Sequence, residues 1–318
     1  MAVQFHPGLQ PNDPRKARLY ARMFLKAGVT PPATVDYSGF TPIGMLGNDS
    51  VGDCVEAGAG HVFEQQTFYG QGSEYAVSTQ QAISMYSQVT GYNPADPNTD
   101  QGTVLQDGLD YMRKTGIGGH KIAAFAQLDP TNMNEVKTAV AEFGTVMIGF
   151  PFPDSAMDQF NKGQPWDVVP GATIDGGHCV IVVGYTSAYL LVITWGAVQK
   201  MTYAFWNTYV AGKGQGGEAW ALVDQEWVNK QTGKDPEGVD LTAFGAQYAA
   251  LTNQPNPFPN SPTPTPVPTP TPTPTPVPVG PDATEIALAG AAHRWMDRYF
   301  KPKYMVTALE NWLTDKNL

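Results

Sequence analysis

A long proline- and threonine-rich segment limits which parts of this chain can fold together. Residues 254–281 consist largely of Pro, Thr and Val. Proline lacks a backbone N–H and holds the chain extended, so this segment cannot join a packed core and we expect a polyproline-II linker. At about 3.1 Å per residue, its repetitive part, residues 262–279, would reach roughly 55 Å. The sequence therefore predicts a domain of residues 1–253, this linker, and a tail of residues 282–318.

The tail carries two apolar stripes at helical spacing, separated by Pro302. The first stripe contains Leu288 and Trp295, and the second contains Leu309 and Trp312. Two short helices bury little surface by themselves. We expect the tail to dock on a partner or to oligomerise; the alternative is a marginally ordered tail.

The composition argues against several classes of partner. The chain has 318 residues, 42% of them hydrophobic, and 19 basic against 29 acidic side chains give a net charge of −10. This balance argues against binding to nucleic acid or to an anionic membrane. The sequence shows no basic segment followed by an apolar run at its start and no run of about 18 apolar residues, so neither a signal peptide nor a membrane span is expected. We expect a cytoplasmic or virion-associated protein.

Hydrophobic periodicity divides the first domain into a helical half and a strand-rich half. Helices are expected at 13–27, 54–69, 78–90, 103–114 and 134–143, and strands at 145–150, 179–185, 189–194 and 218–223. Ser78 to Gln81 has the form of a capping box. Gly58 and Gly60 each weaken a helix by about 1 kcal/mol, so we expect close packing there. Helices followed by strands indicate an α+β fold with a cleft between two lobes.

The most reactive candidate is Cys54, which lies where a polar, glycine-containing loop changes into an apolar helix. The dipoles at a helix N-terminus favour negative charge and therefore a thiolate. Asp49, Asp53 and Glu56 would instead raise the thiol pKa if they lie close, or select a basic substrate side chain. Two cysteines in a chain of this length do not form a disulfide framework. The alternative is that Cys54 is a small buried residue at a loop–helix junction.

Among the five histidines, His178 is the best candidate for a base that acts with Cys54. It opens a predicted strand and follows Gly176-Gly177, which would allow a backbone or a substrate to approach closely. Side chains alternate along a strand, so if His178 faces the cleft and Cys54, Cys179 faces the opposite side as a small hydrophobe. A histidine at the start of a strand can also be purely structural. We find no phosphate loop and no metal-ligand cluster in the sequence, and no metal or cofactor is expected.

Several short motifs resemble the papain-like cysteine peptidases over about residues 30–225. In order, they are Pro32, Val35-Asp36-Tyr37, Thr41-Pro42-Ile43, Gly52-Asp53-Cys54, the segment 136–150, Phe160 to Gly163, His178-Cys179-Val180 with Val183-Gly184-Tyr185, and Thr194-Trp195-Gly196. The resemblance implies a two-lobed α+β fold with a helical N-terminal lobe and an antiparallel, β-rich C-terminal lobe. It also implies hydrolysis of a peptide or amide bond through an acyl-enzyme.

The same resemblance implies roles for individual residues. Cys54 would be the nucleophile, and His178 the base that also protonates the leaving group. Asn48 would stand in for the family's oxyanion glutamine, six residues before the nucleophile, although an asparagine there is also an ordinary turn residue. With the backbone N–H of Cys54, such a donor is worth roughly 3 kcal/mol of transition-state stabilisation.

Other positions depart from the family or match it only loosely. Thr194 stands at or beside the place of the asparagine that orients the histidine, and would hold the ring less firmly. Trp195 would cover that contact, or would simply be a core tryptophan. Gly102 and Gly177 would line the substrate cleft. The family's disulfide cysteines are missing, and no long inhibitory segment precedes residue 30, so zymogen control is not expected.

Three functions remain open from the sequence. The first is a cysteine peptidase that acts on a peptide or protein substrate through Cys54 and His178. The second uses the same pair as a cell-wall peptide amidase or transpeptidase. The third is a non-catalytic papain-like structural or adaptor protein of the kind found in phage virions, which the departure at Thr194 and the linker with its tail favour.

Overall fold

The computed structural model describes residues 3–11, 30–41, 43–212, 216–238, 240–252, 255–256 and 258. The helix expected at 13–27, almost all of the linker and the whole tail lie outside these residues. The division of the chain into three parts therefore remains a prediction.

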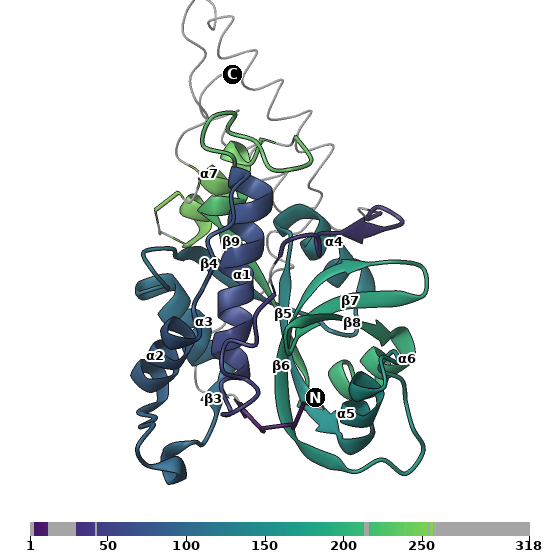
Figure 1. Cartoon of the computed structure of the whole chain (residues 1–318). Coiled ribbons are helices and arrows are strands. Elements are labelled where there is room, and N and C mark those ends of the chain that lie inside the picture. The colour runs from purple at the N-terminus through teal and green to yellow at the C-terminus, as the bar shows by residue number, and fades with distance from the viewer. Residues whose placement is uncertain are drawn as a thin grey trace, which may run out of the picture.

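Three helices form one side of the domain, as Figure 1 shows: α1 (Cys54–Gln71), α2 (Thr79–Thr90) and α3 (Leu105–Lys114). The Ser78 capping box is present, because the Ser78 hydroxyl accepts from the N–H of Gln81 and the Gln81 side chain accepts from the N–H of Ser78. Helix α1 is longer than expected. It continues to Gln71, two residues beyond the predicted end at residue 69, and is capped by Gly72, which has a left-handed φ of 71°.

The other side of the domain is a seven-stranded sheet in which every pairing is antiparallel. Its order is β4-β9-β5-β6-β7-β8, with β2 paired to β6. The strands are β2 (Val35–Asp36), β4 (Ile122–Leu128), β5 (Val146–Pro153), β6 (Ile174–Tyr185), β7 (Tyr189–Thr194), β8 (Ala197–Thr202) and β9 (Glu218–Asp224). Helices on one side and an antiparallel sheet on the other confirm the α+β prediction.

The strands differ from the sequence prediction in number and length. The β6–β7 hairpin is present, but β6 begins five residues earlier than expected because Ile174 to Cys179 pair with the far half of β5. Strands β4 and β8 were not predicted. Strand β4 is rich in alanine, and β8 contains Gln and Lys. Neither strand has the run of β-branched residues that identifies a strand from sequence alone.

Smaller elements complete the chain. They are β1 (Leu9–Gln10), which pairs with β3 (Thr103–Val104); α4 (Met133–Phe143), α5 (Asp154–Asn161), α6 (Tyr203–Phe205) and α7 (Thr242–Thr252); a π-helical turn at Trp206–Val210; and 3₁₀ turns at Pro97–Thr99 and Gln225–Trp227.

The sheet separates two apolar clusters, and alternation along its central strands assigns residues to each. On β6, Val180 and Val182 pack with α4, whereas Cys179 and Ile181 pack with α1. Helix α1 approaches the sheet closely at Gly58, where a Cβ would lie 3.0 Å from the terminal methyl of Met147. The close packing expected at the helix glycines is therefore present, and it holds the start of α1 against β6.

Candidate functional site

Cys54 occupies the first position of α1, as the sequence predicts, but it is buried, with 1% of its surface exposed. Burial is the largest cause that raises the pKa of its thiol, and the nearby carboxyls of Glu56 and Asp53 raise it further. The backbone N–H groups of Cys179 and Val55 act in the opposite direction. The thiol is therefore neutral in this arrangement, with two N–H groups directed at the sulfur.

The two cysteines lie on the same side of the sheet, which corrects one expectation. Cys179 was expected to face away from Cys54, yet both belong to the apolar cluster under α1, and a charge on either thiol would be felt by the other. The reason is the crossing of β6 over α1, which directs the odd-numbered residues of β6 at the helix. Both thiols are free, and Cys179 is otherwise the small buried residue that was expected.

His178 is fully buried on the opposite face of β6. Its Nε2 lies 2.9 Å from the hydroxyl oxygen of Thr194, which is the contact that the sequence predicts. When this oxygen accepts from Nε2–H, Nδ1 carries the lone pair, and Nδ1 has no hydrogen-bond partner in the described structure. Burial lowers the pKa of His178 to about 3, so the ring is a neutral imidazole with one free acceptor.

Aromatic rings surround the His178 imidazole. Trp195 lies over one face of it at a centroid distance of 4.4 Å and an angle of 12°. Phe152 and Phe150 contact it edge-on at 5.2 and 6.2 Å. Trp195 has a left-handed φ of 45°, an unusual value for a tryptophan, and it is 4% exposed. Trp195 therefore adopts a strained backbone conformation at the position where its ring covers the His178–Thr194 contact.

The N-terminal segment lies across this region, which the sequence does not predict. We call residues 3–10 the strap. Figure 1 shows it running from the N-terminal label across β6 to β3. The N–H of Val3 donates to the Asn161 side chain at 2.8 Å, and the ring of Phe5 stacks on Phe152 at 4.5 Å. Phe5 also meets the ring of His178 edge-on at 5.7 Å.

Gly8 of the strap lies directly over the cysteine. Its N–H donates to the carbonyl of Gly177 at 3.3 Å, and its carbonyl accepts from the N–H of Thr103 at 2.6 Å. A Cβ on Gly8 would lie 2.9 Å from the sulfur of Cys54. The Gly8 carbonyl points at Thr103 and not at the sulfur, so the strap covers Cys54 without presenting a bond for attack.

The predicted cleft residues all contact the strap. A Cβ on Gly177 would lie 2.6 Å from the carbonyl oxygen of Leu9, and one on Gly102 would strike the Gly8 carbonyl. Trp195 meets the Phe5 ring at 6.3 Å. Sequence reasoning missed Thr103 as a contact, because a main-chain N–H leaves no signal in the identity of the residue.

Asn48 is buried near the cysteine, but its side chain is engaged elsewhere. Its amide donates to the carbonyl of Val51 at 3.5 Å and lies close to the carboxyl of Asp53. Burial raises the pKa of Asp53, and the charge of Glu56 raises it further. The Asn48 amide is directed at the Val51 carbonyl, and neither carboxylate oxygen of Asp53 has a hydrogen-bond partner among the described residues. A role of Asn48 toward an oxyanion requires the amide to turn.

Glu56, in the first turn of α1, is a second buried carboxyl beside the cysteine. One oxygen accepts from the Thr103 hydroxyl at 2.8 Å, and the other has no partner among the described residues. Burial raises the pKa of Glu56 to about 8. The N–H of Thr103 also binds the strap, so the Glu56 carboxyl connects the start of α1 to β3, the strand that holds the strap.

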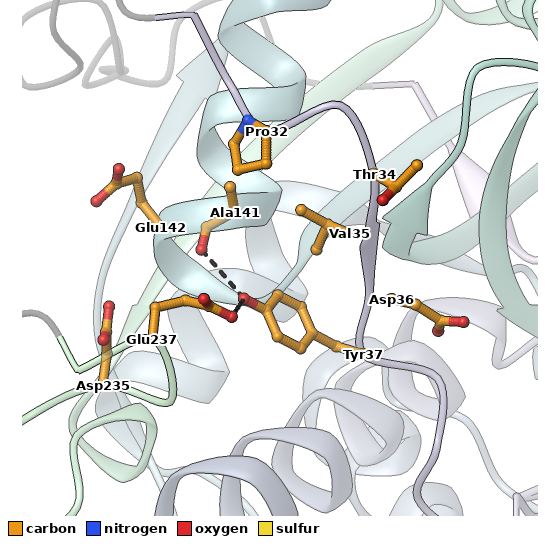
Figure 2. Close-up of a pocket in the computed structure, with 9 residues that line it drawn as sticks. All are labelled: Pro32, Thr34, Val35, Asp36, Tyr37, Ala141, Glu142, Asp235 and Glu237. Carbon is orange, nitrogen blue, oxygen red and sulfur yellow. Dashed lines mark hydrogen bonds between the residues drawn. The ribbon is translucent and has the colours of Figure 1, made fainter.

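A separate hollow of about 330 Å³ lies away from these residues, between β2, the end of α4 and the turn at 235–237. Figure 2 shows its acidic lining, which includes Asp36 and Glu142. The Tyr37 hydroxyl donates to Glu237 at 2.9 Å, and burial raises the pKa of Glu142 to about 7. None of the predicted site residues lines it, and the contacts within it join β2 to the turn at 235–237.

Comparison with solved structures decides the fold. Xylellain, a cysteine protease from Xylella fastidiosa, superposes with a TM-score of 0.53 at 14% identity, covering 70% of this chain and 97% of its own. Digestive procathepsin L2 from the larval midgut of Tenebrio molitor superposes at 0.51 with 21% identity, covering 69% and 78%. The chain has a papain-like fold. Procathepsin L3 from the same midgut gives 0.51 at 15% identity. These identities establish the papain-like fold alone.

Searches by sequence add nothing to this result. No protein-family model matches the chain, and no curated protein matches it. Within the described ranges, no helix is both long and apolar enough to cross a membrane, and no group of His, Cys, Asp and Glu side chains is arranged to hold a metal ion.

Proposed function

We propose that this chain is a cysteine peptidase and that the described arrangement is its closed form. The observation that carries the proposal is the hydrogen-bonded pair of His178 and Thr194, which leaves Nδ1 free. The N–H of the next residue, Cys179, is directed at the sulfur of Cys54. A nucleophile, an oriented base and N–H donors around the sulfur are the parts that thiol acyl transfer needs.

The proposed reaction has two stages. In the open form, in which we propose that the Cys54 sulfur and Nδ1 of His178 come into contact, the thiol transfers its proton to Nδ1 and the sulfur adds to the carbonyl carbon of a peptide bond. The carbon–nitrogen bond then breaks, the amine leaves with the proton from His178, and a thioester remains on Cys54. Water, deprotonated by His178, adds to the thioester and releases the carboxylic acid and the thiol. Asn48 and the N–H of Cys54 are proposed as the donors to the tetrahedral oxyanion.

The closed form is chemically inactive for an electrostatic reason. Desolvation disfavours charge on both partners, so it raises the pKa of the Cys54 thiol and lowers that of His178 to about 3. Proton transfer from sulfur to nitrogen is then strongly unfavourable. Removal of the strap would admit water and substrate to the sulfur and the ring, and both pKa values would move toward each other.

Labelling with a thiol-directed epoxide probe tests this proposal. The full chain and a Gly8→Val variant, in which the strap cannot seat, are treated with the probe and the modified residue is located by mass spectrometry. We expect modification of Cys54, most strongly in Gly8→Val, that drops at least about tenfold when His178→Ala is added, since one base contributes 10²–10⁴-fold. Equal rates with and without His178 would reject a working pair. The Cys54→Ala variant is the negative control and should show no modification at position 54.

A non-catalytic structural or adaptor role is the second candidate, and the acidic surroundings of Cys54 favour it. Asp53 and Glu56 both oppose a thiolate. This role predicts no Cys54 labelling in Gly8→Val above the rate of a free thiol at that pH. If labelling succeeds, cell-wall peptides offered beside ordinary peptides separate an amidase or transpeptidase from a general peptidase.

A further inference from the structure

We call the space that residues 7–9 occupy over Cys54 the groove. At Gly8 it is wide enough for a single main chain. The N–H and the carbonyl of the same residue, Gly8, are bound by opposite walls: Gly177 at 3.3 Å on one side and Thr103 at 2.6 Å on the other. Gly8 is buried between them. A ligand at this point is therefore held through its backbone, with no space beside it for a side chain.

Glycines form the walls themselves. A Cβ on Gly52 would lie 2.5 Å from the carbonyl oxygen of Pro7, and one on Gly177 would lie 2.6 Å from that of Leu9. One on Gly102 would strike the Gly8 carbonyl. In each case the atom struck belongs to the backbone of the strap, so no side-chain rotation could relieve the contact.

A partly buried hydrogen-bond network fixes the position of one wall. The Asp100 carboxylate accepts from the N–H of Gly52 at 3.1 and 3.2 Å and from the Tyr86 hydroxyl at 2.6 Å. The Tyr86 oxygen in turn accepts from the N–H of Gly102 at 2.8 Å. Tyr86 is fully buried, so the two wall glycines are joined through a side chain that packing holds in place.

The side-chain direction of the bound residue points into solid protein. A Cβ on Gly8 would overlap the carbonyl of Gly52 and would lie 2.9 Å from the sulfur of Cys54. Any residue with a Cβ at this point must lift away from the sulfur. The restriction therefore applies to a bound peptide whose chain runs in the same direction as residues 7–9.

We infer that Cys54 selects peptides that place a glycine over its sulfur. The inference rests on the proposed peptidase function and adds a substrate class to it: an extended peptide with glycine at this point. Three residues away, the strap places the aromatic ring of Phe5 on Phe152 at 4.5 Å, beside Trp195. An aromatic side chain at that distance from the glycine is the second element of the preferred ligand.

Binding tests the selectivity without any catalysis. The probes are the capped peptide Phe-His-Pro-Gly-Leu-Gln, the sequence of residues 5–10, and its counterpart with alanine in place of glycine. The protein is the full chain carrying Cys54→Ala and Gly8→Val, which frees the groove and prevents turnover. We expect the glycine peptide to bind at least about tenfold more tightly, because the alanine Cβ meets backbone atoms.

Equal affinities, or no binding of either peptide, would overturn the inference. If Gly8→Val does not fold, Phe5→Asp frees the groove from its other end and the comparison is repeated. Tyr86→Phe should reduce the glycine preference at least about threefold, since a buried hydrogen-bonding hydroxyl contributes about 1 kcal/mol. Tyr92→Phe, which stacks on Tyr86 at 4.8 Å, is the matched control and should keep the preference. If Tyr86→Phe binds the glycine peptide with an unchanged preference over the alanine peptide, Tyr86 does not hold Gly52 and Gly102 in place.

A separate measurement isolates the proposed function. The Gly8→Val variant with Cys54 intact is incubated with a random peptide mixture, and the new ends are sequenced. Cuts enriched in glycine at one position beside the broken bond support both proposals. Cuts without that enrichment overturn the glycine selectivity alone. Glycine-selective binding without any cut overturns the peptidase function and leaves the selectivity standing.

Discussion

Replacement of Gly8 by valine should uncover Cys54. The added Cβ overlaps the Gly52 carbonyl and approaches the sulfur to 2.9 Å, so the strap cannot keep its place. Both hydrogen bonds of Gly8, to Gly177 and from Thr103, are then lost. At a net 0.5–1.5 kcal/mol each, this loss amounts to about 2 kcal/mol.

The expected result is a rate change in thiol labelling. When opening is fast relative to labelling, the labelling rate follows the population of the open form, and about 2 kcal/mol corresponds to roughly a 30-fold increase. Rehydration of the sulfur lowers the thiol pKa and adds to this increase. The assay is second-order labelling of Cys54 by an epoxide probe, followed by intact-mass spectrometry.

Two internal controls separate strap release from unfolding. Gln4→Val changes an exposed strap residue and should leave the rate unchanged. Cys179, which is 2% exposed, should remain unlabelled in every folded variant. If Gly8→Val labels Cys54 no faster than Gln4→Val does, the strap does not control access to the cysteine.

Three further predictions concern the residues around the site. Thr194→Val should lower His178-dependent labelling about tenfold or more and stability by about 1–3 kcal/mol, because the buried Nε2–H loses its acceptor; Thr194→Ser should restore both. Asn48→Ala should reduce peptide turnover about 100-fold yet leave epoxide labelling unchanged, because alkylation forms no oxyanion; an equal loss in both assays would contradict its proposed role. Burial raises the pKa of Glu56 to about 8, so between about pH 4.5 and pH 8 the folded state holds a proton that the unfolded state releases, and stability falls as pH rises. Relative to Glu56→Gln, wild-type stability in urea should therefore fall by about 1.4 kcal/mol per pH unit in that window, and a constant difference would refute the assignment.

Local chemistry made much of the fold predictable. The capping box at Ser78 and the helix after it, the hairpin strand at 189–194, and a cysteine at the first residue of α1 all depend on residues close together in sequence. Thr194 beside His178 was predictable only through a family resemblance, since the two residues lie 16 positions apart.

The parts that sequence could not supply depend on contacts between distant segments. The strap meets residue 177 through a main-chain carbonyl and residue 103 through a main-chain N–H, groups that every residue other than proline carries. The direction of Cys179 was misjudged because alternation says which residues share a face and not which face a helix will cover.

The sequence by itself therefore determined the fold class and the start of α1 at Cys54, and it named the candidate residues for thiol chemistry, because these follow from periodicity, helix capping and side-chain type. Only the tertiary structure decided that the cysteine is buried and neutral beneath residues 3–10, and that His178 is uncharged. The physical reason is that desolvation and steric fit depend on what packs against a residue, and Gly8 lies 46 positions from the sulfur it covers.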